Sequence, residues 1–252
     1  ASCRAAAISL LQTVMLRMLA AAPPGKVRFT IFDPVGLGQN FASFMHLADY
    51  DEALVSHRIW TEPAHIEQRL ADLTEHMETV IQKYLRNDFA SIRQYNELAG
   101  EIAEPFRVLV VANFPAGFTE SAARRLLSIA ASGPRCGVHV LLSADVRLPP
   151  VKGVDTSDLQ RTATIFSATN QGLAWHDPDF KDLPLDVESW PEDESKAVLQ
   201  AIGEAALAAK RVEAPFEAIA PAPGDYWQCD SRRGVDVPLG RAGATRLQHL
   251  RL

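Results

Sequence analysis

The chain has 252 residues and a formal net charge of −6, with 47% hydrophobic and 22% charged residues, a balance typical of a soluble globular protein. The negative charge excludes a global basic field, so any contact with nucleic acid would need a local basic patch. Its three cysteines, Cys3, Cys136 and Cys229, are far apart and show no zinc-binding spacing. They fit a reducing cytoplasm better than a disulfide framework.

The first predicted element is a helix over residues 4–22. It is apolar on nearly all sides, but Arg17 interrupts it and Pro23-Pro24-Gly25 ends it. This favours a buried helix over a membrane span or a signal peptide. A short strand, Val27–Phe32, follows and ends at Asp33-Pro34, and Gly36 and Gly38 then indicate an ordinary turn.

Apolar residues next recur at three- and four-residue spacing from Glu62 or His65 to Leu98, which predicts a long helix. It would span about 45–50 Å if Asn87-Asp88 does not bend it. A strand over Phe106–Ala112, a helix over Thr119–Ser132 and a strand over Gly137–Ser143 come after it.

The alternation of apolar strands with helices predicts an α/β fold built on a parallel sheet that is covered on both faces. Ligand sites in such sheets lie at the carboxyl ends of the strands. Asp33, Asn113 and Asp145 all stand at these ends, and we expect the functional site there.

The last hundred residues give weaker patterns. They predict a short helix near Thr156–Ser167, a loop over Trp175–Pro191, a helix over Glu192–Val212, a stiff linker at Pro215, Pro221 and Pro223, and a β-hairpin within Asp230–Leu252. The hairpin is expected to comprise Gly234–Pro238, a turn at Gly240–Gly243, and Thr245–Leu252. We therefore divide the chain into a core (1–190), a helix with its linker (191–225) and a hairpin opening a second module (226–252).

Five segments resemble the FtsK/SpoIIIE family of RecA-like motor ATPases, over roughly Ser2–Pro149 and again at the hairpin. They are TIFDPVGLGQNFASFMHL, ETVIQKYLRNDFASIRQYN, LVVANFP, ASGPRCGVHVLLSAD and VDVPLGRAGATRLQHLRL. The resemblance implies a RecA-like P-loop NTPase fold, ATP and Mg²⁺ as cofactors, and a cytoplasmic DNA translocase of the kind that acts in cell division.

The departures from the family pattern are as informative as the resemblance. No G-x-x-x-x-G-K-[ST] loop occurs, and Ser2-Cys3-Arg4-Ala5 stands where such a loop would end. Arg4 can replace the lysine charge, but Ala5 has no hydroxyl for a metal. Where the family keeps the acidic residues of its Walker B strand, this chain has Asn113 and Phe114, and its sensor glutamine position is taken by Asp145. The resemblance thus predicts a degenerate motor domain, a pseudo-ATPase.

Two further residues are left with open roles. Asp33 can be a remnant of the nucleotide site or simply a turn cap. Arg135 matches an arginine of the family and can be an arginine finger that reaches a neighbour's phosphate, or an ordinary surface residue. The dispersed histidines favour structural roles over metal binding, so no metal-ligand set is predicted.

The resemblance also suggests the kind of protein to which this chain belongs and its partners. The chain opens inside a predicted helix and closes on a predicted strand, so we expect it to be a fragment of a longer tandem protein. Its partners would be an adjacent FtsK-like domain, a ring of identical subunits and DNA, and no membrane segment is predicted. Two alternatives stay open: a module of a type VII secretion-like ATPase that translocates protein, and a nucleotide-independent assembly domain.

Overall fold

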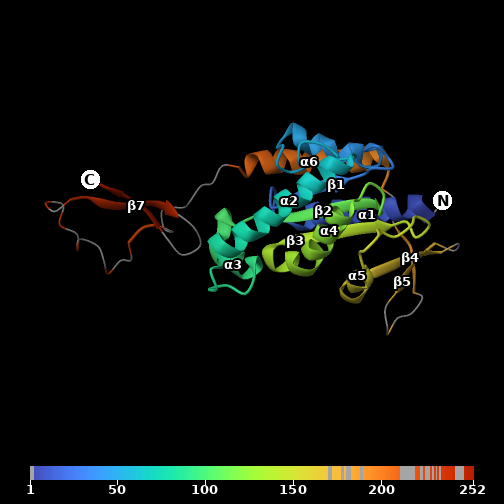
Figure 1. Cartoon of the computed structure of the whole chain (residues 1–252). Helices are drawn as coiled ribbons and strands as arrows, with labels where there is room; N and C mark the ends of the chain where they lie inside the picture. The colour runs from blue at the N-terminus through green and yellow to red at the C-terminus, as the bar shows by residue number, and fades with distance from the viewer. Residues whose placement is uncertain are drawn as a thin grey trace.

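A three-stranded parallel sheet in the order β1-β2-β3 forms the centre of the chain (Figure 1). Its strands are β1 (Val27–Phe32), β2 (Phe106–Phe114) and β3 (Val138–Ala144). The computed structural model describes residues 3–169, 172–176, 179, 183–187, 190–210, 219–221, 224, 228, 230, 232, 234–241 and 247–252. The predicted α/β fold with a parallel sheet is confirmed, and it is the RecA-like P-loop NTPase fold.

Helices cover both faces of this sheet. On one face pack α1 (Cys3–Ala21), the 3-10 helix η1 (Gln39–Asp49) and α6 (Glu192–Ala208). On the other pack α2 (Pro63–Thr79), α3 (Ile92–Ala99) and α4 (Glu120–Ser132). Because β2 is central, Val108–Ala112 are fully buried on both sides, which explains their unbroken apolar run.

Helix α1 is a core helix. By length and composition it could cross a membrane, with a mean hydropathy of 1.3. However, Met15 is fully buried, and Ile8, Leu11, Leu16 and Leu19 pack with it against the sheet. The predicted buried helix is confirmed to within one residue at each end.

The long helix predicted up to Leu98 is broken. Helix α2 passes into a π-helical turn, η2 (Val80–Leu85), and the chain then turns at Arg86 and Asn87, which adopt left-handed φ values of 44° and 64°. Helix α3 begins anew at Ile92. The break allows Phe89 and Tyr84 to pack against Tyr95, so aromatic packing replaces the continuous helix.

Strand β2 is two residues longer than predicted. It runs to Phe114, and its register with β3 shifts between Val111 and Phe114, because Asn113 forms a bulge at a left-handed φ of 59°. Asparagine tolerates this backbone region better than most residues. The bulge sets the direction of the last residues of β2 at the carboxyl-end edge of the sheet, where we expect the functional site.

The C-terminal part departs from the predicted pattern in places. The helix expected over Thr156–Ser167 ends at Thr162 as α5 (Ser157–Thr162), and the region predicted as loop contains strands. A small antiparallel sheet follows, made of β4 (Ile165–Thr169), β5 (Gly172–His176) and β6 (Leu183–Leu185). The remaining short elements are the 3-10 helices η3 (Gly100–Ile102) and η4 (Gly133–Cys136).

The predicted hairpin is present as β7 (Asp236–Arg241) and β8 (Leu247–Arg251), drawn apart from the main sheet in Figure 1. Gly240 and Arg241, which were predicted to lie in the turn, belong to β7 instead. Residues 242–246, and Pro215 and Pro223 of the predicted linker, lie outside the described residues. One side carries Asp236, which pairs with His249 and Arg251. Exposed apolar side chains also mark the hairpin: Val235, Val237, Leu239, Leu250 and Leu252.

Candidate functional site

The end of β1 is organised around Asp33, which is fully buried. Its Oδ1 accepts hydrogen bonds from the Gly36 backbone N–H (3.0 Å) and from Asn40 Nδ2 (3.1 Å). Its Oδ2 accepts from the Asn40 backbone N–H (3.3 Å) and again from Nδ2 (3.0 Å). Both oxygens are therefore engaged within the loop, and the geometry supports the turn-cap interpretation of Asp33.

Gly36 is required by this arrangement. A Cβ at residue 36 would lie 2.7 Å from Asp33 Oδ1 and closer still to Asp33 Oδ2 and Asn40 Nδ2. The glycine that superficially suggested a phosphate loop thus serves close packing against a carboxylate.

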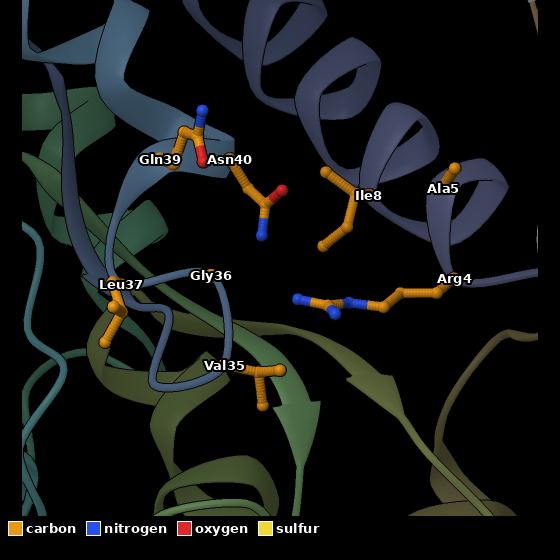
Figure 2. A pocket seen from close by; sticks show the side chains of 8 residues that line it. All are labelled: Arg4, Ala5, Ile8, Val35, Gly36, Leu37, Gln39 and Asn40. Atoms are coloured by element: carbon orange, nitrogen blue, oxygen red, sulfur yellow. The ribbon is translucent and has the colours of Figure 1, made fainter.

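A pocket of about 660 Å³ opens between this loop and the start of α1. Figure 2 shows the Arg4 side chain extending from α1 toward the loop, with Ala5 and Ile8 on the same helix. The pocket is further lined by Val35, Gly36, Leu37, Gln39 and Asn40. Arg4 brings a cation to the N-terminal end of a helix, where the backbone dipole is also positive. The pocket therefore suits an anionic group.

Asp145 stands at the end of β3 and is not a free carboxylate. Arg147 donates to it through Nε (2.8 Å) and Nη2 (2.6 Å), and these hydrogen bonds lower the pKa of Asp145 to about 2, with a smaller contribution from the charge of Arg4. The Asp145 backbone N–H donates to the Phe114 carbonyl (2.8 Å). Asp145 is thus an ionised carboxylate that is held by Arg147 and is also stabilised by the charge of Arg4.

The end of β2 carries no acid. Asn113 is 4% exposed, and its backbone N–H donates to Ser143 Oγ (2.9 Å). Within the part of the chain that the structure describes, its Nδ2 has no hydrogen-bond partner. Phe114 is buried and packs edge-on against Phe118 at 5.1 Å between ring centroids. A phenyl ring in that place can take no part in proton transfer.

Arg135 lies elsewhere. It belongs to η4, which precedes β3 and so lies at the opposite end of the sheet from Asp145. A seven-residue strand separates the two by about 20 Å. The Nε of Arg135 donates to the Ala90 carbonyl (2.9 Å). Arg135 cannot reach the Arg4 pocket of its own chain.

Of the predicted site residues, Arg4 and Asp145 are thus close enough for the charge of Arg4 to affect the pKa of Asp145. Asp33 holds the loop that lines the Arg4 pocket, through its hydrogen bond with Gly36. Sequence reasoning missed Asn40, which holds Asp33, and Arg147, which holds Asp145. Only the short spacing of Asp145 and Arg147, two residues apart, could have indicated a pair.

The residues present fit a bound nucleotide only in part. Arg4 and the helix end suit a phosphate group, but Ala5 offers no oxygen to a metal. Over the described ranges, no three His, Cys, Asp or Glu side chains gather in a way that could hold a metal ion. The donor chemistry is therefore better matched to an anion than to Mg²⁺.

Several solved structures are similar to this chain. One is the cytoplasmic domain of EssC (16% identity, TM-score 0.48, covering 97% of this chain and 52% of that one), and two others are structures of Thermomonospora curvata EccC. The first of these contains its ATPases 2 and 3 with a signal sequence peptide (18%, 0.48, 97% and 48%); the second is the cytoplasmic domain of this type VII secretion ATPase (17%, 0.49, 97% and 31%). The chain thus spans about half or less of the length of these proteins.

No curated protein matches the chain. A family model does, over residues 9–154, which is more than half of the sequence. This range contains β1, β2 and β3 and the helices between them. The chain belongs to the FtsK/SpoIIIE family.

Proposed function

We propose that this chain is a catalytically impaired motor domain that acts as a scaffold or regulator within a larger, cytoplasmic, ATP-driven DNA translocase. One observation carries the proposal: the end of β2 presents Asn113 and a core-packed Phe114 where a motor of this kind needs acidic side chains. Without a carboxylate there, neither the metal nor the attacking water is held by charge.

Three neighbouring residues support it. Ala5 offers no hydroxyl at the start of α1, and both oxygens of Asp33 are already engaged by Gly36 and Asn40. Asp145 is likewise occupied, because Arg147 binds it through two nitrogens. Among the described residues of the site, Arg4 is left to attract a phosphate. We therefore expect weak nucleotide binding that does not depend on Mg²⁺.

The proposal includes the setting of the domain. The hairpin β7–β8 exposes apolar side chains, Val237 and Leu250 opposite one another among them, and two strands alone are at best marginally stable in water. We assign residues 226–252 to a second FtsK-like domain that follows, and residues 191–225 to the tether. That neighbour would supply the ATP hydrolysis, within a ring of identical subunits.

A protein cargo is the second candidate, in a secretion-type motor. It is favoured by exposed apolar side chains after β1 and β3, where Leu37 is 80% and Val146 94% exposed. Apolar groups suit a peptide better than a phosphate backbone. Binding of an apolar peptide, with no binding of duplex DNA at low salt, would support this candidate over the first.

Calorimetry with ATP and ADP, with and without Mg²⁺, tests the impaired site. We expect weak binding that Mg²⁺ does not change and that Arg4→Ala weakens at least about tenfold, or about 1.4 kcal/mol. Arg17→Ala is the matched control, because Arg17 is an exposed arginine on the same helix, about 20 Å further along. Tight Mg²⁺-dependent binding, or hydrolysis that Arg4→Ala abolishes, would restore the active-motor interpretation.

A further inference from the structure

A second cavity, of about 200 Å³, lies at the other end of the sheet from the Arg4 pocket. Its walls come from the edge strand β1, the segment 52–57 that hydrogen-bonds to β1 through Phe29, and helix α2. Three arginines line it: Arg28 from β1, Arg107 from β2 and Arg69 from α2. This cavity has no part in the function proposed above.

Two of these cations are direct neighbours. Arg28 and Arg107 are register partners on adjacent parallel strands, so their Cα atoms are about 4.8 Å apart and their side chains leave the same face. Like charges in this position repel each other. Both side chains are half-buried, where water screens the repulsion less than at the surface.

The arginines are incompletely paired. In the described part of the chain, the buried Nε atoms of Arg28, Arg69 and Arg107 all lack a hydrogen-bond partner. Arg69 has an ion pair with Asp72 (2.9 Å), and Arg107 a long one with Glu104 (3.9 Å). Among the same residues, no carboxylate lies within ion-pair distance of Arg28.

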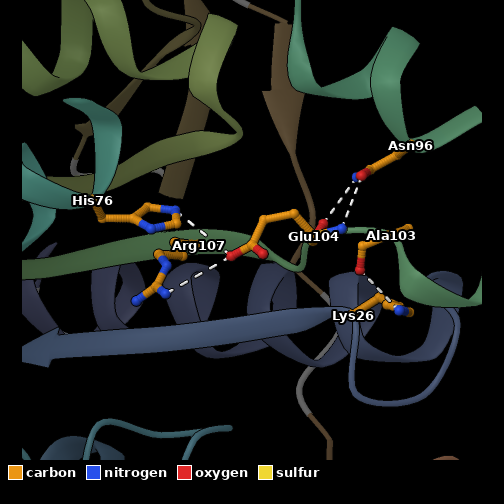
Figure 3. A network of polar contacts seen from close by, with 6 residues as sticks. All are labelled: Lys26, His76, Asn96, Ala103, Glu104 and Arg107. Carbon is orange, nitrogen blue, oxygen red and sulfur yellow. Dashed lines mark hydrogen bonds and ion pairs between the residues drawn. The ribbon is translucent and has the colours of Figure 1, made fainter. Parts of the chain in front are cut away.

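Figure 3 shows the neighbouring polar network, in which the Glu104 carboxylate pairs with both His76 and Arg107. Burial, and then the charges of Arg107 and Arg28, lower the pKa of His76 to about 4. Burial lowers the pKa of Arg107; the charge of Glu104 acts against this shift, and the charge of Arg28 adds to it. The lining itself thus holds three arginines against two carboxylates, Glu52 and Asp72.

We propose that this cavity is a binding site for a phosphate-type oxyanion, held by Arg28, Arg69 and Arg107. Guanidinium groups from two strands and a helix present donors from several directions, as the tetrahedral arrangement of phosphate oxygens requires. Thr30 and Ser56 add hydroxyl groups to the lining. The acids of the lining are already engaged, Asp72 with Arg69 and Glu52 with the exposed His57.

The fluorescence of Trp60 can report binding in the cavity. Its indole N–H donates to Ser56 Oγ (3.2 Å), and the Arg69 guanidinium lies 4.8 Å from its ring centroid. Occupation of the cavity would move both groups and change the fluorescence of Trp60. The experiment is a titration of the whole chain with inorganic phosphate at constant ionic strength, with Trp60→Phe to assign the signal.

We expect a saturable change in fluorescence, with an affinity for phosphate that Arg28→Gln weakens at least about tenfold. Arg28→Lys keeps the charge but lacks the planar set of guanidinium N–H donors, so it should have an intermediate effect. Arg93→Gln is the matched control, since Arg93 is exposed and its ion pair is with Glu97, on its own helix. The signal comes from Trp60, beside this cavity and not beside the Arg4 pocket, so failure of this proposal and failure of the proposed function can be distinguished.

If Arg28→Gln does not fold, Thr30→Val provides a second variant. It removes one hydroxyl of the lining and leaves the arginines in place, so it should weaken the binding of phosphate. Comparing inorganic phosphate with a small phosphate monoester distinguishes a free anion from the phosphate end of a metabolite. The absence of any saturable change in the natural sequence, or equal affinity in Arg28→Gln and Arg93→Gln, would overturn the proposal.

Discussion

Arg147 and Asp145 form a two-point contact across a single intervening residue, with Nε 2.8 Å from Oδ1 and Nη2 2.6 Å from Oδ2. The Arg147 backbone N–H also donates to Oδ1 (3.1 Å). The Asp145 side chain is 19% exposed although its partner is 77% exposed. A carboxylate held in this way at the end of β3 serves local structure and has little capacity left for a ligand.

The charge state of Asp145 in acid should depend on Arg147. Because the hydrogen bonds of Arg147 lower its pKa to about 2, Arg147→Gln should return the pKa toward 3.8, the ordinary value. The contact stabilises the fold fully above about pH 4 and loses its effect as the pH falls through about 2. Carboxyl-carbon NMR titration measures this pKa directly, and Arg93→Gln should not move it. An unchanged pKa in Arg147→Gln would show that the contact does not persist in solution.

Removing the Asp33 carboxylate should destabilise the loop under the Arg4 pocket. Asp33→Ala leaves the Gly36 N–H and the Asn40 side chain without acceptors in a buried place, and each such loss costs about 1–3 kcal/mol. We expect a decrease of this order in the free energy of unfolding, measured with urea. Asp88→Asn, at an exposed residue, should change it by less than about 0.5 kcal/mol. Equal effects would contradict the structural role of Asp33.

Gly36→Ala should disturb the same loop by overpacking. The new methyl group would lie against the Asp33 carboxylate and Asn40, so the loop must shift, at a cost of about 1–3 kcal/mol. Gly224→Ala is the control, because nothing lies within 4 Å of a Cβ there. Thermal unfolding of the two variants compares them directly, and a harmless Gly36→Ala would mean that the loop is looser than described.

His76 should make the fold sensitive to acid. Its side chain is 11% exposed, and burial, together with Arg107 and Arg28, lowers its pKa to about 4. Between the ordinary pKa of 6.5 and this lowered value the unfolded chain binds a proton that the folded chain does not, so stability falls as the pH falls through this window. The loss is on the order of 3 kcal/mol.

The measurement is the free energy of unfolding at about pH 7 and about pH 4.5 in His76→Gln, with the natural sequence beside it. The variant should lose less stability between these two pH values. His46→Gln, which changes a histidine that is 52% exposed, should behave as the natural sequence does. An unaltered difference in His76→Gln would exclude this residue as the source.

Much of the sheet could be predicted because its signals are local. The bounds of β1 are as predicted, since an apolar run there is bordered by Gly25 and by Asp33-Pro34. The helix predicted from Thr119 begins at Glu120, and Thr119 is its N-cap and accepts from the Ala122 N–H (3.1 Å). The carboxyl-end rule also located Asp33, Asn113 and Asp145 at one edge.

What the sequence could not provide depends on tertiary packing. Nothing local indicates that Asn40 turns back to Asp33, because that contact depends on the path of the whole loop. The bulge at Asn113 likewise arises between two strands. The sequence allowed a bend at Asn87-Asp88, and the break lies there, at Arg86 and Asn87. Its extent was not predicted, because Arg86 has a high helix propensity, which the aromatic contacts of Tyr95 outweigh.

At the break, glycine substitutions at two positions four residues apart should change the stability in opposite directions. Arg86 is exposed and has a left-handed φ of 44°, a conformation that glycine adopts without steric strain. Arg86→Gly should therefore stabilise the fold by about 0.5–1 kcal/mol. Gln82→Gly, four residues earlier within η2, should destabilise it by about 1 kcal/mol, because glycine weakens a helix interior. Urea unfolding of both variants resolves the signs. If the two substitutions destabilise equally, Arg86 is helical in solution and the long helix predicted by the sequence pattern is continuous.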